Sequence, residues 1–199
     1  MNFENPRARA LSVDNQKRLA AMNEIDIVRD ISRRFEQAHL PYMLTGSVAM
    51  NYYAQPRMTR DIDVVIAIAS DDVDRVAALF RLDYYVSEES IRESLARESI
   101  FNLIHQESVI KVDCIIRKSS EYRKTEFERR QRISVGDFTT FIVSKEDLII
   151  SKLSWAKDSH SEIQLGDVRN LLGTGYDAKY VTRWTRELEL VNLLKECLK

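Results

Sequence analysis

The sequence predicts an α+β fold, with a small mixed β-sheet flanked by helices and a C-terminal helical extension. Three observations predict it. A long amphipathic segment opens the chain, apolar stretches of strand and helix type alternate in the middle, and the end shows only helical periodicity. With 199 residues, the chain is long enough for one core or for one domain with a small appendage. We expect residues 1–143 to form the core with an N-terminal helix. Residues 144–199 should form a helical segment packed on it.

The first elements follow from their periodicity. Residues 14–38 predict a long helix, because apolar residues recur at helical spacing between charged ones. Residues 42–45 predict a short strand, and residues 47–54 a helix that ends before Pro56. Residues 61–68 are rich in Ile and Val, which favours a strand.

The middle of the chain continues the alternation. Residues 71–81 predict a helix whose acidic first turn suits the helix dipole. Residues 84–86 predict an edge strand, and residues 88–98 a short amphipathic helix. The stretches 100–106 and 108–116 are separated by a tight turn, which indicates an antiparallel hairpin.

The remaining elements are a second hairpin and the terminal helices. Residues 133–143 predict a hairpin that turns at a Gly-Asp pair. Ser144 followed three residues later by Asp147 is a variant of the capping box, and predicts a helix start. Two more helices are expected over residues 161–172 and 178–198, separated by Gly-Thr-Gly.

Composition excludes several classes of protein. The net charge is −1 and the pI about 6.3, so no overall basic excess indicates nucleic-acid binding. No apolar run is long enough for a membrane span, and the N-terminus lacks the order of a signal peptide. Cys114 and Cys197 have no metal-like spacing and fit reduced thiols. We therefore expect a cytoplasmic protein without a membrane partner.

Asp61 and Asp63 are the first candidate site residues. In a strand, alternate residues point to the same face, roughly 7 Å apart at their Cα atoms. Two carboxylates held this close repel each other unless a cation lies between them, and Mg²⁺ suits such a position. The alternative is an exposed strand edge with two solvated aspartates. The apolar character of Ile62 and of the residues after Asp63 argues against that alternative.

Asp113 is the single acidic residue of an apolar strand, where an unpaired carboxylate is costly. If this strand lies beside that of Asp61 and Asp63, three carboxylates meet on one face. Two could then hold metal ions, and the third could activate an attacking hydroxyl group. For Asp113 alone, a buried salt bridge with Lys111 or an arginine is the simpler interpretation.

Gly46 and Ser47 stand where a strand turns into a helix. The unpaired N–H groups of such a junction can bind a phosphate, and glycine allows the backbone to approach the ligand. The serine hydroxyl can cap the helix or bond a phosphate oxygen. Taken alone, this pair also begins many ordinary helices.

Together these residues resemble the signature of the nucleotidyltransferase superfamily, which has the polymerase-β-like fold. Gly46-Ser47 is followed by 13 residues and then by Asp61-Ile62-Asp63-Val64, and Asp113 matches the later strand carboxylate of that family. The stretch "RMTRDID" is similar to the form in AbiEii-like and minimal bacterial nucleotidyltransferases. So are "EDLIISKLSWAK" and "LGDVRNLL".

The resemblance implies roles for these residues. Gly46 and Ser47 would bind the triphosphate, and Asp61 and Asp63 would coordinate Mg²⁺ in a site that holds two metal ions. Asp113 would complete that site or act as the general base.

The resemblance also implies a set of supporting residues. Lys152 would be the cation on the phosphate side, unless it is an ordinary lysine whose stem packs on apolar surface. Asp167 would orient Lys152 or Arg169, or form a plain helix salt bridge. Arg57 and Arg60 would contact phosphates or balance the charge of the neighbouring aspartates.

The implied function is a Mg²⁺-dependent nucleotidyltransferase. It would move a nucleoside monophosphate from an NTP to a hydroxyl group of RNA (tRNA, for example), a protein or a small molecule. Related proteins suggest a toxin–antitoxin or phage-defence role, with an antitoxin partner or a homodimer. The alternative is a non-catalytic relative that binds a nucleotide or a partner, such as an antitoxin-like module.

Residues 117–132 hold seven Arg or Lys against three Glu, with Tyr122 and Phe127 between them. Basic residues interleaved with aromatic ones are typical of an RNA-contacting patch. The usual alternative for such a run is a solvated helix face.

Overall fold

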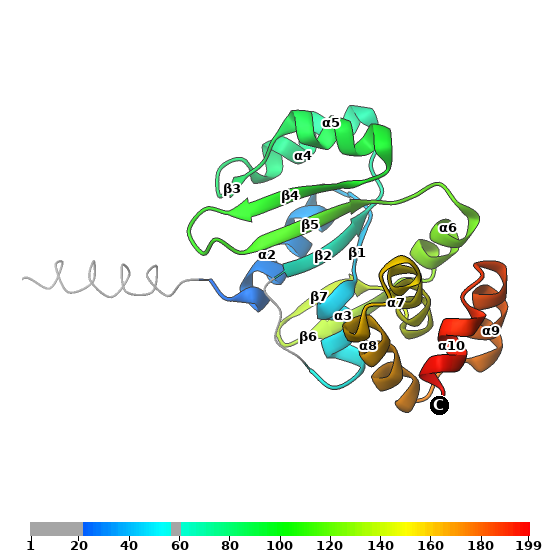
Figure 1. The fold of residues 1–199 in the computed structure, drawn as a ribbon. Coiled ribbons are helices and arrows are strands. Elements are labelled where there is room, and N and C mark those ends of the chain that lie inside the picture. Colours follow the sequence, from blue (N-terminus) through cyan, green and yellow to red (C-terminus); the bar gives the residue numbers. More distant parts are fainter. Residues whose placement is uncertain (1–21, 57–60) are drawn as a thin grey trace, which may run out of the picture.

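The computed structural model describes residues 22–56 and 61–199, and these form a mixed β-sheet with helices on both sides (Figure 1). In these residues the sheet has seven strands in the order β3-β4-β5-β2-β1-β7-β6. The strands are β1 Tyr42–Leu44, β2 Asp61–Ile66, β3 Tyr84–Tyr85, β4 Ile100–His105, β5 Lys111–Ile116, β6 Gln131–Val135 and β7 Phe138–Ile142. The α+β fold class is confirmed.

Helices connect and cover these strands. They are α2 Glu24–Gln37, α3 Gly46–Tyr53, the 3₁₀ turn η1 Ser70–Asp72, α4 Val73–Phe80, α5 Glu88–Arg97, α6 Glu121–Glu128, α7 Lys145–Ser159, α8 Glu162–Gly173, α9 Ala178–Glu187 and α10 Val191–Cys197. In the part of the chain that the structure describes, no helix combines the length and apolarity that a membrane crossing requires.

The predicted start of the first helix is wrong within the described residues. The helix begins at Glu24 and not before it, because Asn23 is its N-cap. The Asn23 side chain accepts a hydrogen bond from the Asp26 backbone N–H, and the Asp26 side chain bonds back to the Asn23 N–H. This capping box satisfies two otherwise unpaired donors. Residues 14–21 of the predicted helix lie outside the described residues.

The single helix predicted over 178–198 is also wrong. Helix α9 ends at Glu187, and Glu189 has a left-handed backbone with a φ of 59°. The Leu190 N–H then donates to the carbonyl of Thr185 at 2.7 Å, which closes the helix end. Continuous apolar periodicity concealed this break, since it carries no Gly or Pro signal.

Both predicted hairpins are confirmed. Strands β4 and β5 pair antiparallel, as do β6 and β7, which turn at Gly136 with a φ of 58°. Strand β3 lies at the sheet edge, as expected. Strands β2 and β5 are parallel neighbours, although 44 residues separate their ends and starts. This pairing brings distant residues of the chain together.

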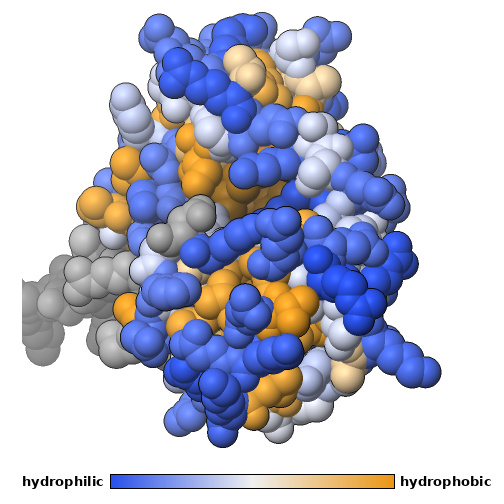
Figure 2. Space-filling view, turned by 45° about the vertical axis from the view of Figure 1, so that its right-hand side comes forward, coloured by the Kyte–Doolittle hydropathy of each residue, from blue (hydrophilic) through white to orange (hydrophobic). Residues whose placement is uncertain are grey.

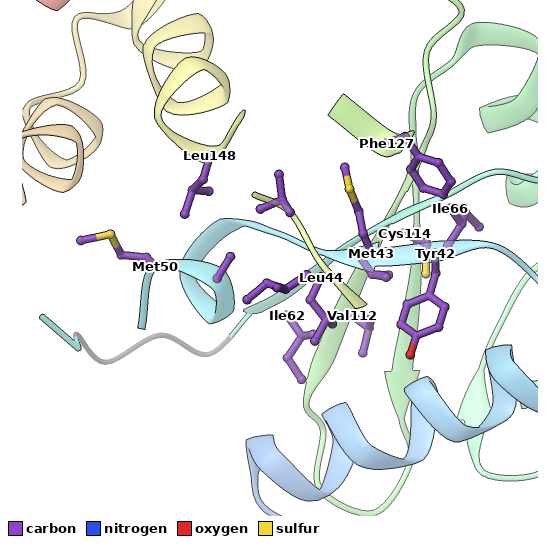
Figure 3. Packing of buried hydrophobic residues seen from close by; sticks show 14 of the residues in the cluster. Tyr42, Met43, Leu44, Met50, Ile62, Ile66, Val112, Cys114, Phe127 and Leu148 are labelled. Atoms are coloured by element: carbon purple, nitrogen blue, oxygen red, sulfur yellow. The ribbon is translucent and has the colours of Figure 1, made fainter. Parts of the chain in front are cut away.

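The two faces of the sheet differ. Tyr42, Leu44, Ile62 and Val112 point towards α2 and form the larger core with it (Figure 3). Met43, which alternates with its neighbours, points to the opposite side. On that side Met50 of α3 and Leu148 of α7 are buried (Figure 3). Because Asp61 and Asp63 alternate with Ile62, they belong to the α3 and α7 side.

The Ser144 cap is confirmed. The Ser144 hydroxyl accepts from the Asp147 N–H at 3.2 Å and starts α7. Helix α7 packs on α3 and on α8. The boundary predicted at residue 144, between a core and a helical segment, stays a prediction.

Candidate active site

The sheet face that carries the aspartates opens into a pocket of about 340 Å³. We call it the aspartate pocket. Its walls come from β2, β5, the start of α3, and from α7 and α8. They are formed by Thr45, Gly46, Ser47, Asp61, Asp63, Asp113, Ile115, Leu148, Ser151, Lys152, Trp155, Ile163 and Gln164. Figure 2 turns the right-hand side of Figure 1 forward and shows a largely hydrophilic surface with apolar areas gathered in its middle.

Gly46 lies directly against the Asp63 side chain. A Cβ atom added to Gly46 would overlap the carboxylate, at 2.7 Å from its Cγ and closer still to Oδ2. The φ of Gly46 is 57°, in the left-handed region that favours glycine. Backbone and side chain therefore meet here only because residue 46 has no Cβ. The Thr45 N–H donates to the Asp63 carbonyl at 2.9 Å and fixes this contact.

Substituting Gly46 by alanine is expected to reduce both stability and nucleotide binding. The added Cβ must displace Asp63 and must also hold a positive φ, a combination that costs on the order of 1–3 kcal/mol. Urea denaturation and NTP titration would measure the two effects. The same change at Gly166, where an added Cβ meets nothing within 4 Å, is the matched control. Equal behaviour of the two variants would contradict the assigned contact.

The three predicted carboxylates share one face. Asp63 pairs in register with Asp113 across the parallel β2–β5 ladder, and Asp61 pairs with Lys111. Burial, followed by the nearby carboxylates of Asp113 and Asp61, raises the pKa of Asp63 to about 6. Lys152 and a hydrogen bond from the Ser47 backbone act in the opposite direction. The site thus carries more negative charge than its own cations balance.

Asp113 contacts two donors that also belong to the strands. The Lys111 ammonium lies 3.1 Å from Asp113 Oδ2 and 3.7 Å from Asp61 Oδ1. The amide of Asn102 donates to Asp113 Oδ1 from the neighbouring strand. Both interpretations of Asp113 from the sequence therefore hold in part. It forms a salt bridge with Lys111, and it also lies beside Asp63 in the pocket.

The donor set fits a hard divalent cation in its chemistry. Mg²⁺ binds carboxylate oxygens, and usually only one or two of them together with substrate phosphates. In residues 22–56 and 61–199, no three His, Cys, Asp or Glu side chains converge closely enough to hold a metal ion by themselves. Lys111 instead occupies the space between Asp61 and Asp113. Asp61 and Asp63 would hold such an ion together with a nucleotide.

Lys152 enters the pocket from α7 and is almost fully buried. Its ammonium lies 2.6 Å from Asp167 Oδ2 and donates to Gln164 Oε1 at 3.2 Å, and both partners come from α8. Of the two partners predicted for Asp167, the structure places Lys152 against it. Arg169 lies near Glu162 and Glu196 instead. The buried carboxylate fixes the position of the ammonium group.

Arg57 and Arg60 lie outside the described residues. The basic run over residues 117–132 forms α6 and its flanks, with Tyr122 and Phe127 3% and 5% exposed. Both rings belong to the core, which contradicts the aromatic part of the RNA-binding interpretation. Arg123 lies 2.9 Å from Glu126, which is buried in the same helix. A solvated helix face does not describe this segment either.

Several lining residues were missed at the sequence level. Trp155 and Ile163 are large apolar side chains that are 58% and 65% exposed, and both line the aspartate pocket. Asn102 reaches Asp113 from β4. A polar residue at an alternating position of a strand is a signal for Asn102. No local signal distinguishes Trp155 from an ordinary helix residue.

The sequence matches no protein-family model, and no curated protein matches it significantly. Its structure is similar to several solved proteins. The solution structure of the antibiotic-resistance factor ANT(2'')-Ia has a TM-score of 0.58 at 11% identity, over 87% of this chain and 95% of that one. ANT(2'')-Ia in complex with adenylyl-2''-tobramycin gives 0.56 at 12%, over 88% and 99%. The lincomycin-bound lincosamide adenylyltransferase LnuA gives 0.50 at 17%, over 77% and 99%.

These likenesses extend over nearly the whole length of the solved proteins, at identities that establish a shared fold. Their agreement confirms the fold implied by the Gly-Ser and Asp-Ile-Asp motifs. The chain therefore has the nucleotidyltransferase fold.

Proposed function

We propose that the protein is a nucleotidyltransferase that moves a nucleoside monophosphate from an NTP to the hydroxyl group of an acceptor. One observation carries the proposal. Asp61, Asp63 and Asp113 line a single pocket with the Gly46–Ser47 helix start and the buried Lys152. Phosphoryl transfer needs mainly positioning and charge neutralisation, and this set of groups supplies both.

In the proposed reaction the acceptor oxygen attacks the α-phosphorus of the NTP. A bond forms between these two atoms, the bond from the α-phosphorus to the bridging oxygen breaks, and pyrophosphate leaves. The proton of the acceptor hydroxyl passes to a carboxylate, for which Asp113 is the candidate because Asn102 and Lys111 fix its orientation.

The other residues would bind the nucleotide. The backbone at Gly46 and Ser47 approaches the ligand closely, and Lys152 faces its phosphates. Asp61 and Asp63 would hold Mg²⁺, in a site for two ions if Asp113 takes part. Bound there, Mg²⁺ would neutralise charge on the phosphates. The excess negative charge that raises the pKa of Asp63 supports this assignment.

The solved neighbours support a small hydroxyl compound as one kind of acceptor. LnuA binds lincomycin, and ANT(2'')-Ia holds adenylylated tobramycin. RNA and protein acceptors, and a toxin–antitoxin or phage-defence setting with a protein partner, rest on the sequence resemblance.

Release of pyrophosphate tests the proposal independently of the acceptor. The full chain is incubated with Mg²⁺, each labelled NTP and, in turn, total RNA, the protein itself and pools of small hydroxyl compounds. We expect transfer with at least one acceptor, and a loss of about 10²–10³-fold in Asp61→Asn. Asp71→Asn, at an exposed position in η1, is the control and should remain active.

Two results would contradict the proposal. Equal rates in wild type and Asp61→Asn would remove these aspartates from catalysis. Binding of an NTP with Mg²⁺, without transfer to any acceptor, would favour the non-catalytic nucleotide-binding alternative.

A further inference from the structure

A second pocket lies next to the aspartate pocket on the same side of the sheet. We call it the basic pocket. Its volume is about 300 Å³, which is large enough for a small molecule. The two pockets share wall residues, namely Thr45, Ile115, Ser151 and Trp155. A ligand in the basic pocket would therefore lie beside a nucleotide bound in the aspartate pocket.

The basic pocket has a net positive charge. Its ionisable wall residues are Arg117, Lys118, Arg123 and Glu126. Arg123 donates to both carboxylate oxygens of Glu126, at 3.0 and 2.9 Å, so these two charges cancel. The charges that remain are those of Arg117 and Lys118. Such a pocket attracts an anionic ligand and repels a polycation.

Arg117 lacks the partner that a ligand would provide. Its backbone N–H donates to the Ile66 carbonyl at 2.9 Å, which holds it at the end of β5. Its Nε is buried, and among the described residues no acceptor bonds to it. Its guanidinium lies 5.7 Å from the centre of the Phe127 ring, which is an apolar neighbour. A guanidinium binds phosphate oxygens with two parallel hydrogen bonds, so a phosphate group suits this position.

Trp155 separates the two pockets and is 58% exposed. An exposed indole offers a flat apolar surface on which a sugar or another ring can pack. The other tryptophan of the sequence, Trp184, is only 4% exposed. The fluorescence of Trp155 is therefore a selective reporter of ligands in these pockets.

The geometry points to the basic pocket as the acceptor site, and to an acceptor that carries a phosphate monoester on a ring, as a sugar phosphate does. The phosphate would bind Arg117 and Lys118, the ring would pack on Trp155, and a hydroxyl group would face the aspartate pocket. The role as acceptor site rests on the proposed function, whereas the binding of the phosphate compound does not. A polycation such as tobramycin would be excluded by the two cationic side chains.

The test is a titration of the full chain, saturated with Mg²⁺ and a non-hydrolysable NTP analogue. The ligands are ribose 5-phosphate, inorganic phosphate and tobramycin, and binding is followed by calorimetry and by acrylamide quenching of Trp155. We expect ribose 5-phosphate to bind and to protect Trp155 from acrylamide. Inorganic phosphate should bind more weakly and without protection, and tobramycin should not bind.

Substitution then locates the site. Arg117→Gln should weaken binding of ribose 5-phosphate at least about tenfold, because a charge-assisted bidentate contact is lost. Arg186→Gln, at an exposed arginine of α9, is the matched control and should leave the affinity unchanged. Neither variant should alter binding of the NTP analogue.

Four results would overturn the inference. They are equal affinity in wild type and Arg117→Gln, competition between ribose 5-phosphate and the NTP analogue, binding of tobramycin in preference to ribose 5-phosphate, and no binding of either phosphate compound in the millimolar range. If the NTP analogue itself does not bind, the titration is repeated without it. Binding of ribose 5-phosphate that depends on Arg117 would then show that the proposed function fails and the basic pocket stands.

Discussion

The Asp63→Asn variant is expected to lose nucleotide transfer and to be more stable than the wild-type protein near neutral pH. The loss of activity, about 10²–10³-fold or more, follows from removing a charge proposed to hold Mg²⁺ against the phosphates. The gain in stability follows from the pKa of Asp63. Burial and the neighbouring aspartates raise this pKa from 3.8 to about 6 in the folded protein.

The direction of the pH effect follows from this shift. Because the folded protein holds the proton more tightly than the unfolded chain, protonated Asp63 favours folding. That advantage is fully present below pH 3.8 and is lost as the pH rises through about 6. Above this range the ionised Asp63 destabilises the folded state by up to about 3 kcal/mol, given 1.36 kcal/mol per pKa unit. Asparagine has a similar shape and no charge, so it removes this cost.

Urea denaturation in the presence of a chelator would measure the difference at several pH values. The advantage of Asp63→Asn should be largest above pH 6 and should decrease steadily as the pH falls towards 4. Added Mg²⁺ with NTP should stabilise the wild type more than the variant. Asp71→Asn, exposed in η1, serves as the control. A variant that is less stable than wild type at every pH would show that the Asp63 carboxylate is a structural group.

The second large effect is expected at the ion pair of Lys152 and Asp167. Both side chains are buried, with exposures of 4% and 5%, and their charged atoms lie 2.6 Å apart. Lys152→Met leaves the Asp167 carboxylate buried without this cation, which costs about 3–5 kcal/mol. The same variant removes a cation proposed to face the phosphates, so NTP affinity should fall as well.

A double variant separates these two effects. Replacing both charges, as Lys152→Met with Asp167→Leu, leaves no buried unpaired charge and should restore most of the stability. NTP binding should stay weak, because the phosphate-side cation is still missing. Urea denaturation and NTP titration of the two single variants and the double variant measure this. Recovery of NTP affinity in the double variant would show that Lys152 acts only in packing.

Local patterns were enough to predict most of the elements. The hairpins, the Ser144 cap and the strands with alternating burial all depend on residues close in sequence, so composition and spacing contain the information. The capping box at Asn23 could have been read from Asn and Asp at the right spacing. The break at Glu189 could not, since a left-handed glutamate depends on how α9 and α10 pack.

The site divides in the same way. The spacing of Asp61 and Asp63 predicted a shared face, and Gly46-Ser47 predicted a helix start beside them. That Asp113 lies in register with Asp63, rather than elsewhere on the sheet, depends on the pairing of two strands far apart in the chain. Lys152 and its partner Asp167 likewise meet only because α7 packs on α8.

By itself, the sequence determined the elements, the fold family and the carboxylates of the candidate site, because each follows from residues at fixed short spacing. Only the tertiary structure decided that a Cβ at residue 46 would collide with Asp63. Only the tertiary structure placed Lys111 between Asp61 and Asp113, and Arg117 and Trp155 beside a second pocket. The physical reason is that contact between distant segments depends on strand order and helix packing, which no local pattern encodes.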